Sequence, residues 1–126
     1  IPLEHITSNE LARQMRISDP LTNRSVTAGW YFRVMDALYS AWQEADRFTA
    51  PLLLLQGEAD QVVRADAPLD WYPTIGSTDK SLHLLPGLLH ELLNEPGWEG
   101  TIGQILDWLE HRIPAGRLGS RSRVAA

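Results

Sequence analysis

Two residues thirty positions apart, Asp60 and His90, carry side chains that could cooperate in acid–base chemistry. Asp60 follows the apolar segment 52–55, and His90 follows a second apolar segment, 81–85. If both segments are strands of one open parallel sheet, they end at the same edge, where such sheets place their sites. An Asp that orients a His is two-thirds of a nucleophile–base–acid relay.

Both residues also have simpler interpretations, which the residues alone leave open. Asp60 stands in a glycine-containing segment and could be an ordinary turn residue. His90 could begin a helix from a partly buried loop. A further histidine, His83, alternates with leucines, which favours a structural or exposed role over a catalytic one. His90 and Glu91 lack the second histidine of a metalloprotease motif, so we predict no metal site and no cofactor.

The elements that must position this pair are two strands and the segment between them. Four consecutive leucines at 52–55 predict a strand that is buried on both faces inside a parallel sheet. After it, Asp66 could cap a short helix that tolerates Pro68 in its first turn and ends at Pro73. Strand, helix and strand (81–85) within about 35 residues form a βαβ unit, so the two strands should be parallel.

Two helices are expected in the first 46 residues. Thr7 and Glu10 have the spacing of a capping box, which would start a short helix that runs through about Met15. The segment 27–46 is the longest helical candidate, and its apolar side chains cover two adjacent stripes. Core packing is the favoured interpretation of so wide an apolar arc, and a face toward a substrate cleft is the alternative.

The last helix is predicted from a second capping box, formed by Thr101 and Gln104, and from an apolar face that continues to Ile113. Pro114 should stop this helix. The remaining residues, 115–126, contain arginines and no acidic residue, and we expect them to be a disordered tail.

Composition narrows the class of protein. The 126 residues carry a net charge of −5, which argues against a nucleic-acid-binding surface. The sequence contains no cysteine, which excludes disulfides, a thiol nucleophile and a cysteine-based metal site. No apolar run approaches the roughly 20 residues of a membrane span, and no signal peptide is visible. We therefore expect a cytoplasmic protein without a transmembrane segment, whose chain begins inside a longer polypeptide because it lacks an initiator Met.

Three motifs follow one another along the chain. The first is an apolar strand followed by Gly-x-x-Asp, at 57–60. The second is Gly-x-x-Asp-Lys, at 76–80. The third is Gly-x-x-His-Glu-Leu at 87–92, followed by Asn-Glu-Pro at 94–96. In this order the motifs resemble the C-terminal part of α/β-hydrolases, most closely the monoacylglycerol lipase and lysophospholipase-like group of serine hydrolases. The resemblance covers most of residues 10–113.

This resemblance implies both a fold and a reaction. The fold is α/β: a helical cap segment, 1–46, precedes the C-terminal part of the hydrolase core, 47–114, which has β-α-β-α order and parallel strands. The implied reaction is hydrolysis of a carboxylic ester through an acyl-serine intermediate, with a small-molecule acyl ester or lipid as substrate. Asp60 would be the triad acid and His90 the general base, while no substrate-binding residue is assigned.

One part of the family pattern is missing. No Gly-x-Ser-x-Gly nucleophile elbow occurs in the sequence. Because the family order is Ser, Asp, His, the nucleophile should precede residue 1, and the chain alone should be inactive. The alternative is a truncated, non-catalytic hydrolase remnant that acts as an interaction module.

The family resemblance also predicts a partner for one sheet edge. In the family the strand at 52–55 is internal, with the 81–85 strand on one side and an earlier strand on the other. An unpaired four-leucine edge would be an aggregation site. We expect the N-terminal part of the same enzyme to cover it, and a second copy or a rearranged cap helix are the alternatives.

Overall fold

The computed structural model describes residues 1–23 and 25–113, which form four α-helices and two strands. The prediction of a disordered tail at 115–126 lies outside the described residues. Short 3₁₀ turns occur at Leu3–His5, Ala45–Arg47 and Tyr72–Thr74. The main elements in chain order are α1 (Glu10–Ser18), α2 (Ala28–Gln43), β1 (Leu52–Gly57), α3 (Ala67–Trp71), β2 (Lys80–Leu85) and α4 (Trp98–Glu110).

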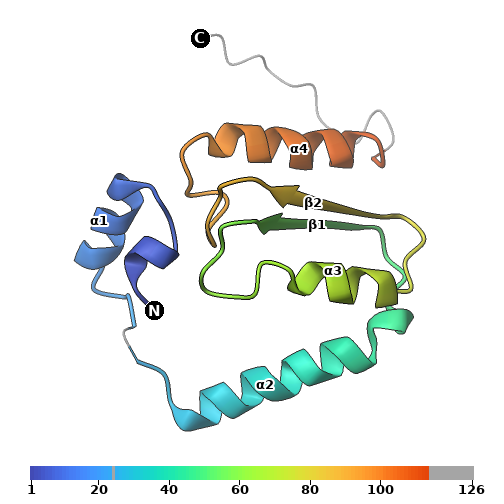
Figure 1. The fold of residues 1–126 in the computed structure, drawn as a ribbon, viewed down its shortest axis with the longest axis horizontal. Coiled ribbons are helices and arrows are strands. Elements are labelled where there is room, and N and C mark those ends of the chain that lie inside the picture. The colour runs from blue at the N-terminus through green and yellow to red at the C-terminus, as the bar shows by residue number, and fades with distance from the viewer. Residues whose placement is uncertain (24, 114–126) are drawn as a thin grey trace.

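The two strands pair in parallel, as the βαβ pattern predicts, in a register that runs from Leu52 opposite Lys80 to Gly57 opposite Leu85. Figure 1 shows α4 on one side of the strands and α3 on the other, with α2 beyond α3. Helix α1 lies off the ends to which both strand arrows point (Figure 1). The α/β fold class is thus confirmed, and both strands deliver their carboxyl ends toward α1.

Strand β1 is less buried than its sequence predicts. Leu52 to Leu55 are each only partly buried, so the expectation of burial on both faces is wrong for this chain. An apolar groove borders each face of the strand, one shared with α2 and α3 and the other with α4. Within the described residues β1 pairs with β2 alone, so its second edge has no strand partner. The described elements next to β1 therefore leave part of the surface of these four leucines exposed.

Helix α1 is capped by Asn9 rather than by the predicted cap, Thr7. The Asn9 side chain accepts hydrogen bonds from the amides of Leu11 and Ala12, at 3.1 and 3.3 Å. Asn is a stronger N-cap than Thr, which explains the two-residue displacement. The helix ends at Ser18, because the following Asp19 precedes a proline and takes an extended conformation.

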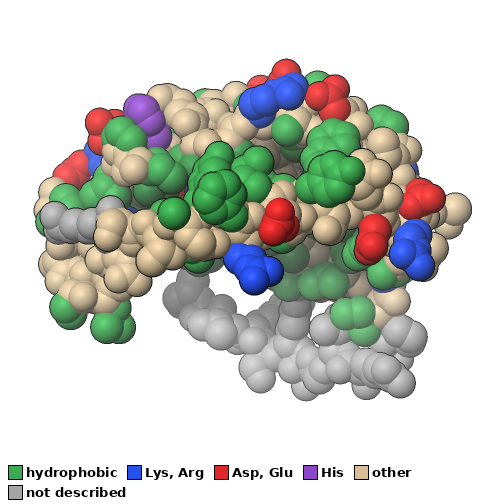
Figure 2. All heavy atoms as spheres, turned by 90° about the horizontal axis from the view of Figure 1, so that it is seen from below, with side chains coloured by type: hydrophobic (Ala, Val, Ile, Leu, Met, Phe, Trp, Pro, Cys, Tyr) green, Lys and Arg blue, Asp and Glu red, His purple; other side chains and the backbone are tan. Residues whose placement is uncertain are grey.

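Helix α2 is capped by Thr27, whose hydroxyl accepts from the Trp30 amide at 3.1 Å. None of its residues is buried, so the interpretation as core packing is wrong within the described part of the chain. Large side chains along the helix are half exposed, among them Trp30 at 54 % and Tyr39 at 67 %. Figure 2 shows hydrophobic side chains spread over the face on which α2 lies. The wide apolar arc is a surface in this chain.

Helix α4 begins earlier than its predicted capping box. Gly97 takes a left-handed conformation, with φ of 80°, and the helix starts at Trp98. Thr101 is therefore a buried residue inside the helix and not its cap. Gln104 instead bonds to the exposed His83 ring, 2.9 Å from Nδ1. The capping-box prediction is wrong because the chain already enters the helix after Gly97, which leaves Thr101 to line the groove between α4 and β1.

Helix α3 has five residues and ends where Pro73 predicts, because a proline has no N–H for the α-helical bond and a 3₁₀ turn follows. Asp66 occupies the N-cap position, but its carboxylate accepts from Arg64 Nε and not from the helix. The following motif at 76–80 ties this turn to β2. Lys80 Nζ donates to the carbonyls of Tyr72 and Ile75, at 2.8 and 2.6 Å.

Candidate active site

The carboxyl end of β1 is joined by backbone contacts to the loop that follows β2. The amide of Glu58 donates to the Leu85 carbonyl, and the amide of Ala59 donates to the Leu88 carbonyl, each at 3.0 Å. Gly57 allows this approach, because a Cβ at that position would stand 2.3 Å from the Leu88 oxygen. The glycine of the first sequence motif thus brings the two strand ends into contact.

Asp60 lies at this junction, with a side chain that is 2 % exposed. One carboxylate oxygen, Oδ1, accepts from the amides of Val62 and Val63, at 2.8 and 3.1 Å. The other, Oδ2, lies 2.9 Å from Gln56 Nε2 and 2.9 Å from His90 Nδ1. The four contacts account for the hydrogen-bonding capacity of a buried carboxylate and hold it in one orientation.

The structure brings Asp60 and His90 together, as their positions at the strand ends predict. An ionised carboxylate only accepts hydrogen bonds, so the Nδ1 atom of His90 carries the proton and Nε2 has a free lone pair. Among the described residues, Nε2 has no hydrogen-bond partner, and the side chain is 38 % exposed. The imidazole is thus oriented with its basic nitrogen available to a further group.

The surroundings of Asp60 favour its charged form. Burial acts to raise the pKa of this carboxyl, but the hydrogen bonds from His90, Val62, Val63 and Gln56 outweigh it and hold the pKa below its ordinary value. A carboxylate that is ionised at neutral pH can stabilise the imidazolium formed when His90 accepts a proton. The pair can therefore work as a general base with its orienting acid.

Sequence reasoning missed two residues of this region, Gln56 and Glu95. Gln56 orients the Asp60 carboxylate, and the only signal for it is that it interrupts the leucine run before Gly57. Glu95 is a carboxylate that is 1 % exposed, five residues after His90. Glu95 stands inside the Asn-Glu-Pro motif, but this motif does not predict which residues hydrogen-bond to its carboxylate.

An apolar groove of about 220 Å³ lies between α2, α3 and β1, and it is lined in part by Gln56 and Val63, which both hydrogen-bond to Asp60. Its lining includes Leu38, Trp42, Leu54, Val63 and Trp71. In the part of the chain that the structure describes, no group of three or more His, Asp or Glu side chains could hold a metal ion. Likewise, no described helix is long and apolar enough to cross a bilayer.

A parallel pair of strands with flanking helices, and an Asp–His pair where the strands end, define the C-terminal part of an α/β-hydrolase. A model of the family described as serine aminopeptidase, S33, matches residues 1–97, and the chain belongs to this family. The resemblance to the monoacylglycerol lipase-like group is confirmed by the relatives it matches.

Three relatives illustrate this similarity. The monoacylglycerol lipase of Mycolicibacterium smegmatis is 26 % identical over 115 residues, which cover 86 % of this chain and 41 % of the relative. The phospholipase YtpA of Bacillus subtilis is 29 % identical over 97 residues, 76 % of this chain and 38 % of the relative. The crystal structure of Paleococcus ferrophilus monoacylglycerol lipase matches with a TM-score of 0.81 and 28 % identity, over 86 % of this chain and 43 % of that one.

The chain therefore spans about two fifths of the length of these relatives. It contains the strand-end residues Asp60 and His90 but no Gly-x-Ser-x-Gly motif. No serine hydroxyl in residues 1–23 and 25–113 hydrogen-bonds to His90. In the described residues, the site thus consists of an Asp–His pair to which no serine hydroxyl is bonded.

Proposed function

We propose that this chain is the C-terminal part of a serine hydrolase that cleaves carboxylic esters through an acyl-serine intermediate. The observation that carries this proposal is the 2.9 Å contact between a buried Asp60 carboxylate and the Nδ1 atom of His90. This contact leaves Nε2 as the proton acceptor. The nucleophilic serine and the donors that stabilise the oxyanion belong to residues outside this chain.

In the proposed reaction, His90 Nε2 removes the proton of the serine hydroxyl as its oxygen attacks the ester carbonyl. Asp60 stays ionised and stabilises the imidazolium. His90 then returns the proton to the leaving alcohol, and in the second half it activates the water that hydrolyses the acyl-serine. Gln56 takes no part in proton transfer and keeps Asp60 Oδ2 directed at His90.

The substrate class follows from the apolar surroundings of this pair. The groove beside Leu54 and Trp42, together with the exposed apolar face of α2, suits an acyl chain better than a polar substrate. Monoacylglycerol- or lysophospholipid-like esters are the proposed substrates. Residues 1–46 would act as the cap over the acyl chain, 47–114 as part of the catalytic core, and the protein would work in the cytoplasm.

The partner of the open β1 edge is proposed to be the N-terminal part of the same enzyme. Its strand would pair with the edge of Leu52–Leu55 that β2 leaves free. The same segment would bring the nucleophile to His90. A second copy of this chain would cover the edge without supplying the nucleophile.

The proposal is tested by His90→Ala in the polypeptide that carries this chain at its natural length. We expect the variant to fold and to lose nearly all hydrolysis of a monoacylglycerol, because the serine is no longer deprotonated. Residues 1–126 alone should not be labelled by a fluorophosphonate, since nucleophile and oxyanion donors are missing. Turnover of His90→Ala at the parental rate would refute His90 as the general base, whereas a natural-length polypeptide without esterase activity would favour the non-catalytic remnant.

A further inference from the structure

Glu95 is a buried carboxylate that the Asp60–His90 pair does not use. It is 1 % exposed and accepts from the Ser8 amide at 2.6 Å and from the Ser8 hydroxyl at 2.9 Å. The backbone amide of Leu89, the residue before His90, also acts to lower the pKa of this carboxyl. A buried carboxylate surrounded by donors is costly to remove, because each donor is left unsatisfied. Glu95 thus joins residues 87 positions apart, beside the proposed base.

The segment before α1 holds the residue that directly follows His90. The amide of Glu91 donates to the carbonyl of Ile6 at 2.9 Å. Thr7, which is buried, donates its hydroxyl to the Asn94 carbonyl at 3.0 Å. Because the Ile6 carbonyl holds the Glu91 amide and Glu95 holds Ser8 of the same segment, this segment fixes the backbone immediately after His90.

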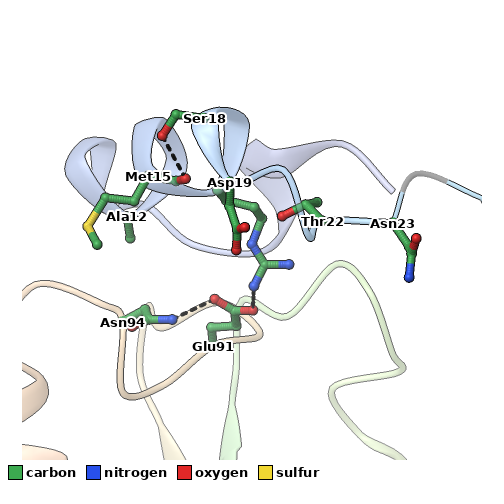
Figure 3. A pocket seen from close by; sticks show the side chains of 9 residues that line it. Ala12, Met15, Ser18, Asp19, Thr22, Asn23, Glu91 and Asn94 are labelled. Carbon is green, nitrogen blue, oxygen red and sulfur yellow. Dashed lines mark hydrogen bonds and ion pairs between the residues drawn. The ribbon is translucent and has the colours of Figure 1, made fainter.

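Helix α1 adds a third contact to the same loop. Arg16 forms an ion pair with the Glu91 carboxylate, which also accepts from Asn94 Nδ2 at 2.7 Å. Figure 3 shows Glu91 and Asn94 of the loop facing α1 across an open cavity of about 700 Å³. The position of the His90 loop is therefore tied to α1 and to the residues that precede it.

The charge of Glu95 is maintained in the folded protein. Burial acts to raise the pKa of its carboxyl, but the contacts with Thr7, Ser8 and the Leu89 amide outweigh burial and lower the pKa. An ionised carboxylate accepts several N–H and O–H donors at once, whereas a neutral amide at the same place would direct its own N–H groups at some of them.

We propose that Glu95 is a positioning residue. Its bonds to Ser8 anchor the segment whose Ile6 carbonyl binds the Glu91 amide, and this holds His90 at the distance from which it bonds to Asp60. This inference rests on the proposed role of His90 as the general base. It makes the segment Ile6–Ser8 part of the active-site support, although that segment lies more than 80 residues from His90 in the sequence. Glu95 itself touches neither the substrate nor the proton that His90 moves.

The test compares Glu95→Gln with Glu99→Gln in the polypeptide at its natural length. Both variants remove one negative charge, but Glu99 is exposed in the first turn of α4. We expect Glu95→Gln to lower kcat/KM for a monoacylglycerol on the order of 10-fold to 100-fold, the effect of a small misplacement of a catalytic group. It should also shift or broaden the downfield NMR signal of the His90 Nδ1 proton, and Glu99→Gln should change neither quantity.

If Glu95 served only to stabilise the fold, the chemical shift of the His90 Nδ1 proton would stay unchanged in the folded fraction of the variant. A folded Glu95→Gln variant with the parental signal and parental kcat/KM overturns this inference. If Glu95→Gln fails to fold, Ser8→Ala takes its place as the test of the inference. This variant removes one hydroxyl donor to Glu95 and leaves the Ser8 amide in place. A parental signal in Ser8→Ala then overturns the inference, and a shifted one supports it. The proposed function fails separately, through an active His90→Ala variant.

Discussion

Gly57 lies against the carbonyl of Leu88 so closely that a Cβ on Gly57 would stand 2.3 Å from the Leu88 oxygen. The carbonyl of Leu89 lies beside it, 2.4 Å from the same Cβ position. This approach brings the loop before Asp60 and the loop before His90 to hydrogen-bonding distance of each other. The glycine is required here for space, since the crowding comes from backbone atoms that cannot turn aside as a side chain would.

Gly57→Ala should therefore disturb the Asp60–His90 contact. The added methyl group must push β1 and the His90 loop apart, and overpacking of this kind costs about 1–3 kcal/mol of unfolding free energy. We expect this loss in denaturant unfolding and a reduced hydrolysis rate in the natural-length polypeptide. Gly103→Ala is the matched control, because a Cβ in the middle of α4 meets no atom within 4 Å. That change should be neutral or stabilising, and equal effects from the two variants would contradict the steric argument.

The stability that Asp60 contributes should depend on pH in one direction. Its pKa is lower in the folded protein than in the unfolded chain, because its hydrogen bonds outweigh the opposing effect of burial. The contribution is therefore complete above the unfolded pKa of about 4 and is lost as the pH falls through the lower, folded value. The free energy of unfolding should differ between the parent and Asp60→Asn most at about pH 7, and this difference should shrink toward about pH 3. A difference that stays constant with pH would count against the Asp60 bonds as its origin.

Lys80 should stabilise the fold through its two bonds to the carbonyls of Tyr72 and Ile75. Lys80→Met keeps the apolar stem but leaves both carbonyls without this donor, at a cost of about 1–3 kcal/mol in unfolding free energy. Arg33→Met, on the exposed surface of α2, removes the same charge and serves as the control. If both variants unfold at the same denaturant concentration, the bonds of Lys80 contribute nothing to stability.

The open edge of β1 can be probed by amide hydrogen exchange. Leu52 and Glu58 donate toward the β2 side, to Asp79 and Leu85, so alternation along the strand directs the amides of residues 53 and 55 toward the free edge. These two amides should exchange rapidly in residues 1–126 alone and slowly in the natural-length polypeptide, where an N-terminal strand would pair with them. Equal exchange rates in both would refute the proposed partner, and protection that depends on protein concentration would indicate a second copy.

The sequence by itself determined the strands and the pair at their ends. The leucine run, the βαβ spacing and Gly57-x-x-Asp60 depend on local chain properties: hydrophobic periodicity, proline and glycine positions, and the rule that parallel strands end at one edge. For the same reason, the sequence alone predicts that Asp60 and His90 lie together. The helix starts were less accurate, because Asn9 and Gly97 displaced the capping residues that spacing alone suggested.

Only the tertiary structure decided which polar groups support this pair. Thr7 reads locally as a helix cap, yet it is buried against Asn94, and Glu95 becomes a buried acceptor only because the chain returns Ser8 to it. Whether α2 is buried likewise depends on contacts with other elements, so its apolar arc could not distinguish a core helix from an exposed one. A contact between two polar residues far apart in the sequence produces no periodic pattern of residue types. The residues next to each partner in the sequence do not depend on that contact, so they cannot predict it.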